Sequence, residues 1–199
     1  MRVSANKSWL PFMPGKHLLA VVLLVTPFIV DVSCEAAISL EYKVKAAYIF
    51  KLINFVEWEK HHNSLNKGDN VNICIIGKHP INEAVQLLGS KKVKSQTVKV
   101  IPKVIADELT ECHIVFMTRS VKDRMQEVLF KVDPDKNLTI SDIPGFAKKG
   151  GMVELATIDN KVKLVINRNK VNASKIQFSS KLMNVSVLVY GGEKGGGVR

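Results

Sequence analysis

The sequence predicts an α/β domain with a mostly parallel sheet and an antiparallel C-terminal hairpin. Strand-like segments alternate with short helix-like segments through the middle of the chain, a pattern typical of a parallel sheet covered by helices on both faces. Two of these strands, VNICIIG at residues 71–77 and HIVFMT at 113–118, are continuous apolar runs, as expected for buried parallel strands. Because strand–helix–strand connections are right-handed, we expect a Rossmann-like, three-layer α/β/α fold.

The first 36 residues have the features of a cleavable secretory signal peptide. Residues 18–30 form an unbroken apolar run behind basic residues, and this run is shorter than the ~20 residues that a membrane-spanning helix needs. Small residues at Cys34 and Ala36 suit cleavage by signal peptidase after Ala36. We therefore expect residues 1–36 to be absent from the mature, exported protein.

Three alternatives at the N-terminus stay open. Cys34 would carry the lipid of a lipoprotein, although Asp31 stands where a lipobox has an aliphatic residue. An uncleaved signal anchor would keep the apolar run in the membrane. Translation from Met13 instead of Met1 would give the signal a more typical start.

The mature chain is long enough for one domain, which we place at residues 39–190, and residues 191–199 are expected to be a disordered tail. The whole chain has a formal charge of +11, which falls to +10 when residues 1–36 leave with three basic and two acidic side chains. The lysines are scattered, and no basic helix with interleaved aromatic residues occurs, so the charge does not predict a nucleic-acid partner. Either the charge only solvates the surface, or it attracts an anionic membrane surface or an acidic protein partner.

Residues 39–58 predict one long helix at the start of the domain. Val44, Tyr48, Leu52 and Phe55 recur at helical spacing, and further apolar residues widen the apolar surface beyond one stripe. A helix that is apolar on most sides is either deeply buried or shared with a second subunit. From this breadth we predict a homodimer.

The following segments alternate between β-type and helical patterns. In chain order they are a strand at 71–77, a helix at 81–88, a strand at 96–101, a short helix at 104–111, a strand at 113–118, a helix at 121–131 and a strand at 137–140. Gly77 and Gly89 end the first of these strands and the first of these helices. Ser120 is expected to cap the helix at 121–131.

The last third of the domain changes to an antiparallel pattern. Residues 152–158 and 161–166 flank a tight Asp-Asn turn, so we expect them to pair as a hairpin at the edge of the sheet. A final amphipathic helix, capped by Ser179 or Ser180, is expected to run through Leu188.

No residue pattern predicts catalysis, a metal site or a cofactor. The first strand ends in the single Gly77, which does not form the glycine-rich turn of a dinucleotide enzyme. His61 and His62 are adjacent and have no further ligand at metal-binding spacing nearby, and a GxSxG elbow is absent. Lys78 and His79 form either an anion site beyond the end of the strand or a solvated loop. We therefore expect a protein that is not an enzyme.

Two cysteines, Cys74 and Cys112, remain after cleavage, an even number in an oxidising compartment. Their strands are neighbours in a sheet of order 2-1-3, so we predict that they form a disulfide. Two buried free thiols are the alternative, because the register of parallel strands can hold the Cα atoms more than ~7 Å apart.

Two stretches of the chain carry a family resemblance. Residues 44–58, VKAAYIFKLINFVEW, end in an aromatic-Val-Glu-Trp run, and residues 137–186 hold Asp-x-Pro-Gly-Phe followed by a double glycine, then a Leu-Val-Ile-Asn strand end and a Ser-Ser-x-Leu-Met run. This combination resembles the YfiR-like family of secreted bacterial proteins over about residues 44–186. The chain departs from the family pattern at Glu59, where proline is usual, and at Leu164 and Val165, which replace Phe and Glu.

The resemblance implies a function that the residues alone do not give. Most members of the family are uncharacterised, and the best understood kind is a periplasmic repressor that binds the outer domain of a membrane diguanylate cyclase. Relief of that binding raises cyclic-di-GMP and promotes biofilm. The chain is thus expected to be a periplasmic, non-enzymatic repressor whose partner is an inner-membrane signalling protein. The alternative is a periplasmic small-molecule-binding protein that serves a transport or envelope system.

The resemblance also implies which residues matter. The expected partner-binding residues are Phe146, Gly150, Gly151, Leu164 and Asn167. Phe146 either plugs the core or anchors a partner at the surface, and Asn167 either satisfies loop amides or contacts a ligand. The structural motif is expected to comprise Trp58, Asp142, Pro144, Gly145, Ser180 and Leu182.

Overall fold

The computed structural model describes residues 39–58, 70–103 and 109–191. The expected signal peptide, His61, His62, most of the predicted helix at 104–111 and residues 192–199 lie outside the described residues. Within the described ranges, every helix is too short or too polar to cross a lipid bilayer.

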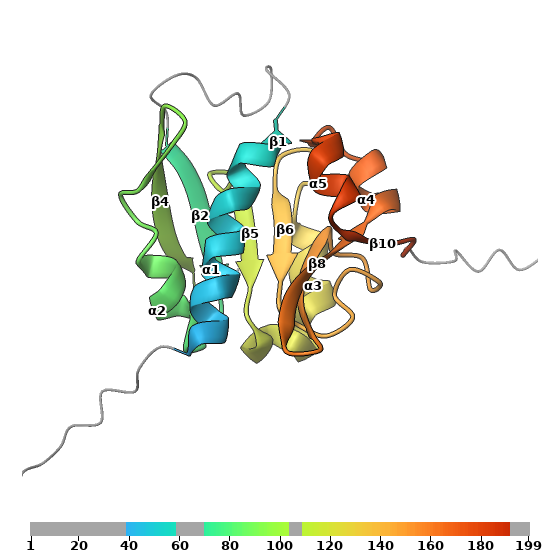
Figure 1. Ribbon diagram of the computed structural model, residues 1–199, viewed down its shortest axis with the longest axis horizontal. Helices are drawn as coiled ribbons and strands as arrows, with labels where there is room; N and C mark the ends of the chain where they lie inside the picture. Colours follow the sequence, from blue (N-terminus) through green and yellow to red (C-terminus); the bar gives the residue numbers. More distant parts are fainter. Residues whose placement is uncertain (1–38, 59–69, 104–108, 192–199) are drawn as a thin grey trace, which may run out of the picture. The chain divides into compact units, whose positions relative to one another are not determined.

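The domain is built on an eight-stranded sheet with the order β10-β8-β7-β6-β5-β2-β4-β3 (Figure 1). Its strands are β2 (Asn70–Ile76), β3 (Lys92–Val93), β4 (Gln96–Lys103), β5 (Ile114–Met117), β6 (Leu138–Ser141), β7 (Val153–Ile158), β8 (Lys161–Asn167) and β10 (Val187–Val189). Only the pairs β3–β4 and β7–β8 are antiparallel. The predicted α/β fold, with its mostly parallel sheet and its hairpin, is confirmed.

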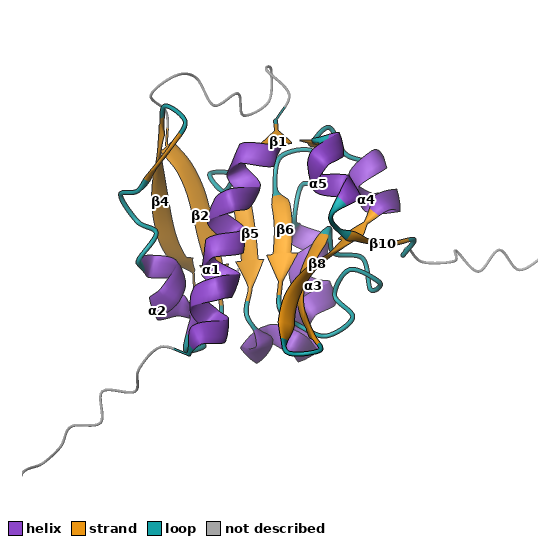
Figure 2. Ribbon diagram, viewed as in Figure 1, coloured by secondary structure: helices purple, strands orange, loops and turns teal. Residues whose placement is uncertain are grey.

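Short helices alternate with the strands along much of the chain (Figure 2). They are α1 (Leu40–Leu52), α2 (Ile81–Gln86), α3 (Met125–Lys131), α4 (Arg168–Asn172) and α5 (Ser180–Asn184), with 3₁₀ turns η1 (Ile53–Phe55) and η2 (Arg119–Arg124). A separate antiparallel pair joins β1 (Val56–Glu57) to β9 (Gln177–Phe178).

Alternate side chains of the central strands enter two separate apolar clusters. In β2, Ile73 and Ile75 belong to the larger cluster, together with residues of α1, α2, α4 and α5. Cys74 and Ile76 belong to the smaller cluster, which also contains Met125 and Val128 of α3. Residues 73–76 of β2 and all of β5 are therefore apolar on both faces of the sheet, which explains the continuous apolar runs in the sequence.

The C-terminal segment differs from the prediction in two ways. The last helix ends at Asn184, and Val187–Val189 form β10, which pairs in parallel with β8. As a result the hairpin is not at the edge of the sheet, because β10 covers β8. Two of the three β10 residues are β-branched valines, which suit a pleated strand better than a helix.

The two predicted long helices are also interrupted. The first leaves the α-helix after Leu52, and Val56–Glu57 pair with β9 instead of continuing the helix. The predicted helix at 121–131 begins as the 3₁₀ turn η2, and α3 starts only at Met125. Ser120 is not its cap, because the Ser120 hydroxyl accepts a hydrogen bond from the Lys78 amide at 3.1 Å.

Candidate functional site

The loop of residues 142–151, called the motif loop below, follows the carboxyl end of β6 and contains most of the residues singled out in the sequence. Gly145 and Gly150 have φ angles of +77° and +109°, which favour glycine. Ser141 starts the loop: its hydroxyl donates to the Met117 carbonyl and accepts from the Ile143 amide. The backbone path of the loop is thus fixed by its own sequence.

Phe146 is the apolar centre of the motif loop. Its side chain is fully buried in the smaller apolar cluster. A β-carbon on Gly151 would overlap the Phe146 ring, and the Gly151 amide donates to the Phe146 carbonyl at 3.0 Å. Of the two alternatives for Phe146, the structure shows the core position, so the hypothesis of an exposed anchor is wrong.

Two polar side chains from the hairpin hold the loop in place. The Glu154 carboxylate, which is 7% exposed, accepts hydrogen bonds from the amides of Gly145 and Ala147 at 3.0 and 3.2 Å. Asn167, fully buried, donates from its amide nitrogen to the Ala147 carbonyl at 2.7 Å, and its oxygen accepts from the Lys170 amide at the start of α4. Asn167 therefore satisfies loop and helix backbone groups, the structural alternative considered for it.

A buried ion cluster links α1 to the start of the motif loop. Lys45 is fully buried, and its Nζ lies 2.6 Å from Glu41 and 3.1 Å from Asp142 Oδ2. Arg119 Nε lies 3.0 Å from the same Asp142 oxygen. Charges removed from water need such partners, so these four residues depend on one another. Asp142 Oδ1 is buried without a hydrogen-bond partner among the described residues.

Glu41 is the exposed end of this ion cluster. The hydrogen bond from Lys45, helped by one from Thr157 at 2.7 Å, lowers the pKa of the Glu41 carboxyl below its usual value. Since the folded pKa is lowered, the stability that this pairing adds is present at neutral pH. It is lost as the pH falls through the lowered pKa.

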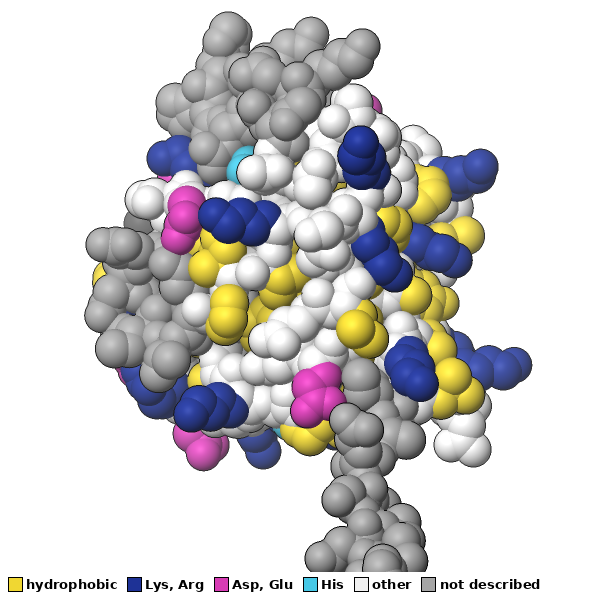
Figure 3. All heavy atoms as spheres, turned by 90° about the vertical axis from the view of Figure 1, so that its left-hand side faces the viewer, with side chains coloured by type: hydrophobic (Ala, Val, Ile, Leu, Met, Phe, Trp, Pro, Cys, Tyr) yellow, Lys and Arg dark blue, Asp and Glu magenta, His cyan; other side chains and the backbone are white. Residues whose placement is uncertain are grey.

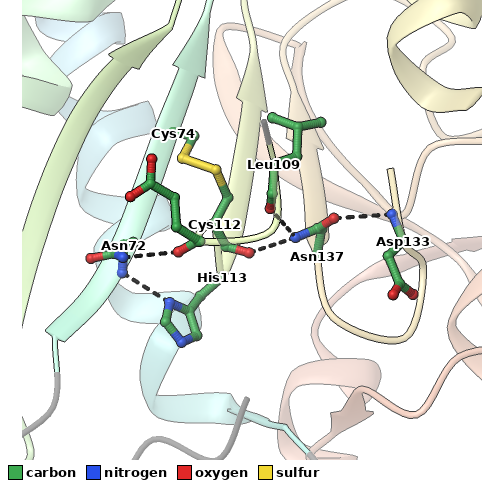
Figure 4. Close-up of a disulfide and its surroundings, with 8 residues drawn as sticks. Asn72, Cys74, Leu109, Cys112, His113, Asp133 and Asn137 are labelled. Atoms are coloured by element: carbon green, nitrogen blue, oxygen red, sulfur yellow. Dashed lines mark hydrogen bonds between the residues drawn. A yellow bond between two sulfur atoms is a disulfide. The ribbon is translucent and has the colours of Figure 1, made fainter. Parts of the chain in front are cut away.

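The predicted disulfide is present between Cys74 of β2 and Cys112, directly before β5, with Cα atoms 5.7 Å apart (Figure 4). Polar groups around it fix the same end of the sheet. The Asn137 side-chain amide donates to the carbonyls of Leu109 and Cys112. The backbone amide of Asn72 donates to His113 Nδ1 at 3.1 Å. His113 is thus a structural residue.

The carboxyl ends of β2 and β5 are filled by the protein's own hydroxyl groups. Thr118 Oγ1 donates to the Ile76 carbonyl at 3.0 Å, and a β-carbon on Gly77 would overlap the hydroxyls of Thr118 and Ser120. The ring of His79 lies edge-on to Tyr42 at 5.2 Å. These contacts favour a packed turn over the anion site considered for Lys78 and His79.

Two surface grooves are relevant to the site, one beside α3 and one beside α1. The α3 groove, of about 450 Å³, is lined by Leu129, Phe130, Val132, Lys149, Gly150 and Lys170 among others. The α1 groove, of about 560 Å³, is lined by Leu40, Glu41, Val44, Tyr48, Lys161 and Val162 among others.

The expected partner-binding residues separate into buried and accessible positions. Phe146, Gly151, Leu164 and Asn167 are all buried, so direct contact with a partner would require the domain to open. Gly150 is the exception, because it lines the α3 groove.

The expected structural residues have identifiable contacts or positions. Trp58 donates from its indole nitrogen to the Lys136 carbonyl at 3.1 Å and meets the His113 ring edge-on. Leu182 is buried, whereas Pro144 is exposed at the surface of the motif loop. Ser180 is the first residue of α5, and Ser179 caps that helix by accepting from the Leu182 amide.

Sequence reasoning missed Lys45, Glu154 and Phe130. Lys45 stands four residues after Glu41 on the predicted helix, and Glu154 interrupts the apolar start of a strand. A charged residue at an inward position signals a buried polar partner. The exposure of Phe130 has no signal in the sequence, because a single apolar residue on a predicted helix is indistinguishable from a core residue.

A protein-family model described as YfiR/HmsC-like matches residues 42–187. No curated protein matches the chain. The matched range includes α1 from its third residue, the sheet up to the first residue of β10, the disulfide and the motif loop.

Proposed function

Because the chain belongs to the YfiR/HmsC-like family, we propose that it is a non-enzymatic repressor of a membrane diguanylate cyclase in the bacterial periplasm. Residues 1–36 direct its export and are removed after Ala36. The folded domain then binds the periplasmic part of the cyclase and holds the enzyme in its inactive state.

The observation that carries this proposal is the family match over almost the entire described domain. Two features of the molecule support it. The motif residues Asp142, Phe146 and Gly151 are used to build a buried loop, as suits a binding module whose shape matters. The disulfide between Cys74 and Cys112 agrees with an oxidising compartment.

Deletion of the gene tests the proposal. Loss of the repressor should raise cellular cyclic-di-GMP and biofilm, and a full-length copy should restore both. A copy that lacks residues 1–36 should stay in the cytoplasm and fail to restore them. The purified mature domain should bind the periplasmic domain of at least one membrane diguanylate cyclase of the same genome. Unchanged cyclic-di-GMP after deletion would rule out the repressor function.

A second candidate, a periplasmic small-molecule-binding protein, is favoured by the α1 groove. Leu40, Val44 and Tyr48 line it together with Lys161 and Lys163, and Glu41 adds one carboxylate, so the lining suits a small ligand with an apolar body and a carboxylate placed at the lysines. Screening small aromatic carboxylates by thermal shift tests this candidate. A hit that Lys161→Glu abolishes would favour it, and the absence of any hit would count against it.

A further inference from the structure

The α3 groove combines a fully displayed aromatic side chain with a concave surface. Phe130 is 93% exposed, more than any of the other large apolar side chains that the structure exposes. Beside it, Leu129 and Val132 are half-buried and Met152 forms part of the floor. An aromatic side chain held in water at the rim of a groove is the kind of residue that dominates binding energy at protein interfaces.

The groove is positively charged. Lys149 and Lys170 are both exposed on its lining, and no acidic residue lies among the described residues that form it. Neither lysine forms an ion pair with another described residue, whereas the acidic residues nearby on α3 and beyond, Glu127 and Asp133, pair with Arg124 and Lys136. The charge of the two lysines is therefore available to an acidic partner.

The floor of the groove is preformed by the motif loop. The left-handed backbone of Gly150 brings the loop close to α3 and α4, and a β-carbon there would lie 3.9 Å from Leu129 and 3.8 Å from Lys170. The Gln126 side chain donates to the Lys149 carbonyl at 2.9 Å and ties α3 to the loop. A preformed surface loses little entropy when a partner binds.

We propose that the α3 groove is the docking surface for the cyclase. Its occupant is a segment of the cyclase periplasmic domain that carries an apolar side chain flanked by carboxylates. The apolar side chain packs between Phe130 and Leu129, and the carboxylates lie against Lys149 and Lys170. This inference rests on the proposed function and assigns it a surface. It also gives the motif loop a role in binding, because the loop positions Lys149 and Gly150.

Binding of purified mature variants to the cyclase periplasmic domain, measured by calorimetry, tests the proposal. Phe130→Ala should weaken binding about 10-fold or more, as expected for a central aromatic residue. The double variant Lys149→Glu, Lys170→Glu should weaken it comparably at low salt and less at high salt. The matched control is Leu87→Ala, directly after α2, which removes a 61% exposed apolar side chain elsewhere and should leave binding unchanged.

The outcomes separate the surface from the function. All these side chains are exposed, so the variants should melt at the wild-type temperature. If the wild type binds the cyclase domain and both Phe130→Ala and the double lysine variant bind equally well, the docking surface is overturned and the repressor function is kept. Absence of wild-type binding to every cyclase domain of the genome would overturn both. If the groove variants lose self-association and still bind the cyclase domain, the groove belongs to an interface with a second copy of the chain and the proposal is overturned.

Discussion

Phe146 and Gly151 depend on each other sterically at the centre of the motif loop. The ring of Phe146 occupies the space that a β-carbon of residue 151 would need, and the backbone of Gly151 is hydrogen-bonded to the Phe146 carbonyl. Glu154 and Asn167 then fix the loop from the hairpin. The residues that identify the family in the sequence are therefore largely residues that keep one loop in one shape.

Gly151→Ala should lower the free energy of unfolding by about 1–3 kcal/mol, because the added methyl group overpacks a closed site. Phe146→Leu should relieve part of that overlap, so the double variant should be less destabilised than the sum of the two single variants. Urea unfolding of the four proteins measures this coupling. Strict additivity would show that the ring and the glycine do not share space.

At the level of elements, predictions succeeded where the local pattern and the tertiary contacts agree. The apolar runs of β2 and β5 predicted neighbouring buried strands, and Asp159 and Asn160 predicted a tight turn, in which both have positive φ angles. The predicted helix was wrong at Val187–Val189 because these residues form a strand only by pairing with β8, which lies about twenty residues away in the sequence. The Lys45–Asp142 pair was not predictable from local pattern for the same reason, since 97 residues separate its members.

The disulfide should make an important contribution to the pairing of β2 with β5. It closes a loop with a sequence separation of 38, for which the chain-entropy model gives about 4 kcal/mol of stabilisation. Reduction should therefore lower the urea midpoint of the mature domain markedly. The double variant Cys74→Ser, Cys112→Ser should unfold at the reduced midpoint and not respond to reductant. Two free thiols per denatured, unreduced chain would contradict the bond.

On the scale of the whole molecule, the excess of basic residues is distributed and not focused. Figure 3 shows lysine and arginine side chains spread over the face that carries β4 and α2, with apolar surface between them. The exposed residues Lys91, Lys92, Lys94 and Lys99 belong to the β3–β4 region. Such a surface supports solubility and a general attraction to anionic surfaces.

A homodimer stays a prediction, but its expected interface changes. Tyr48, Phe50 and Phe55, which helped to suggest a dimer because they widen the apolar surface of the first helix, pack against the domain's own core. Exposed apolar side chains instead occur around the outer strand β10, at Val185, Val187 and Tyr190.

Light scattering should give a dimer mass for the mature domain at high micromolar concentration. Val187→Lys should shift it to a monomer, because a charge on an outer strand opposes edge pairing. The control Leu87→Lys, directly after α2, should leave the dimer intact. A monomer mass for the wild type at that concentration would end the idea.

The pairing of Lys45 with Asp142 also has a consequence for the order in which the chain acquires its structure. Helix α1 is synthesised first, yet its buried ammonium group has its innermost partner 97 residues later, beyond β6. Contacts between such distant residues form late, because a long loop must close before they contribute. Until residue 142 has emerged, docking of α1 onto the strands already made would bury Lys45 with Glu41 as its only partner in the cluster. The nascent chain should therefore keep α1 undocked, and open to a holding chaperone, for most of its synthesis.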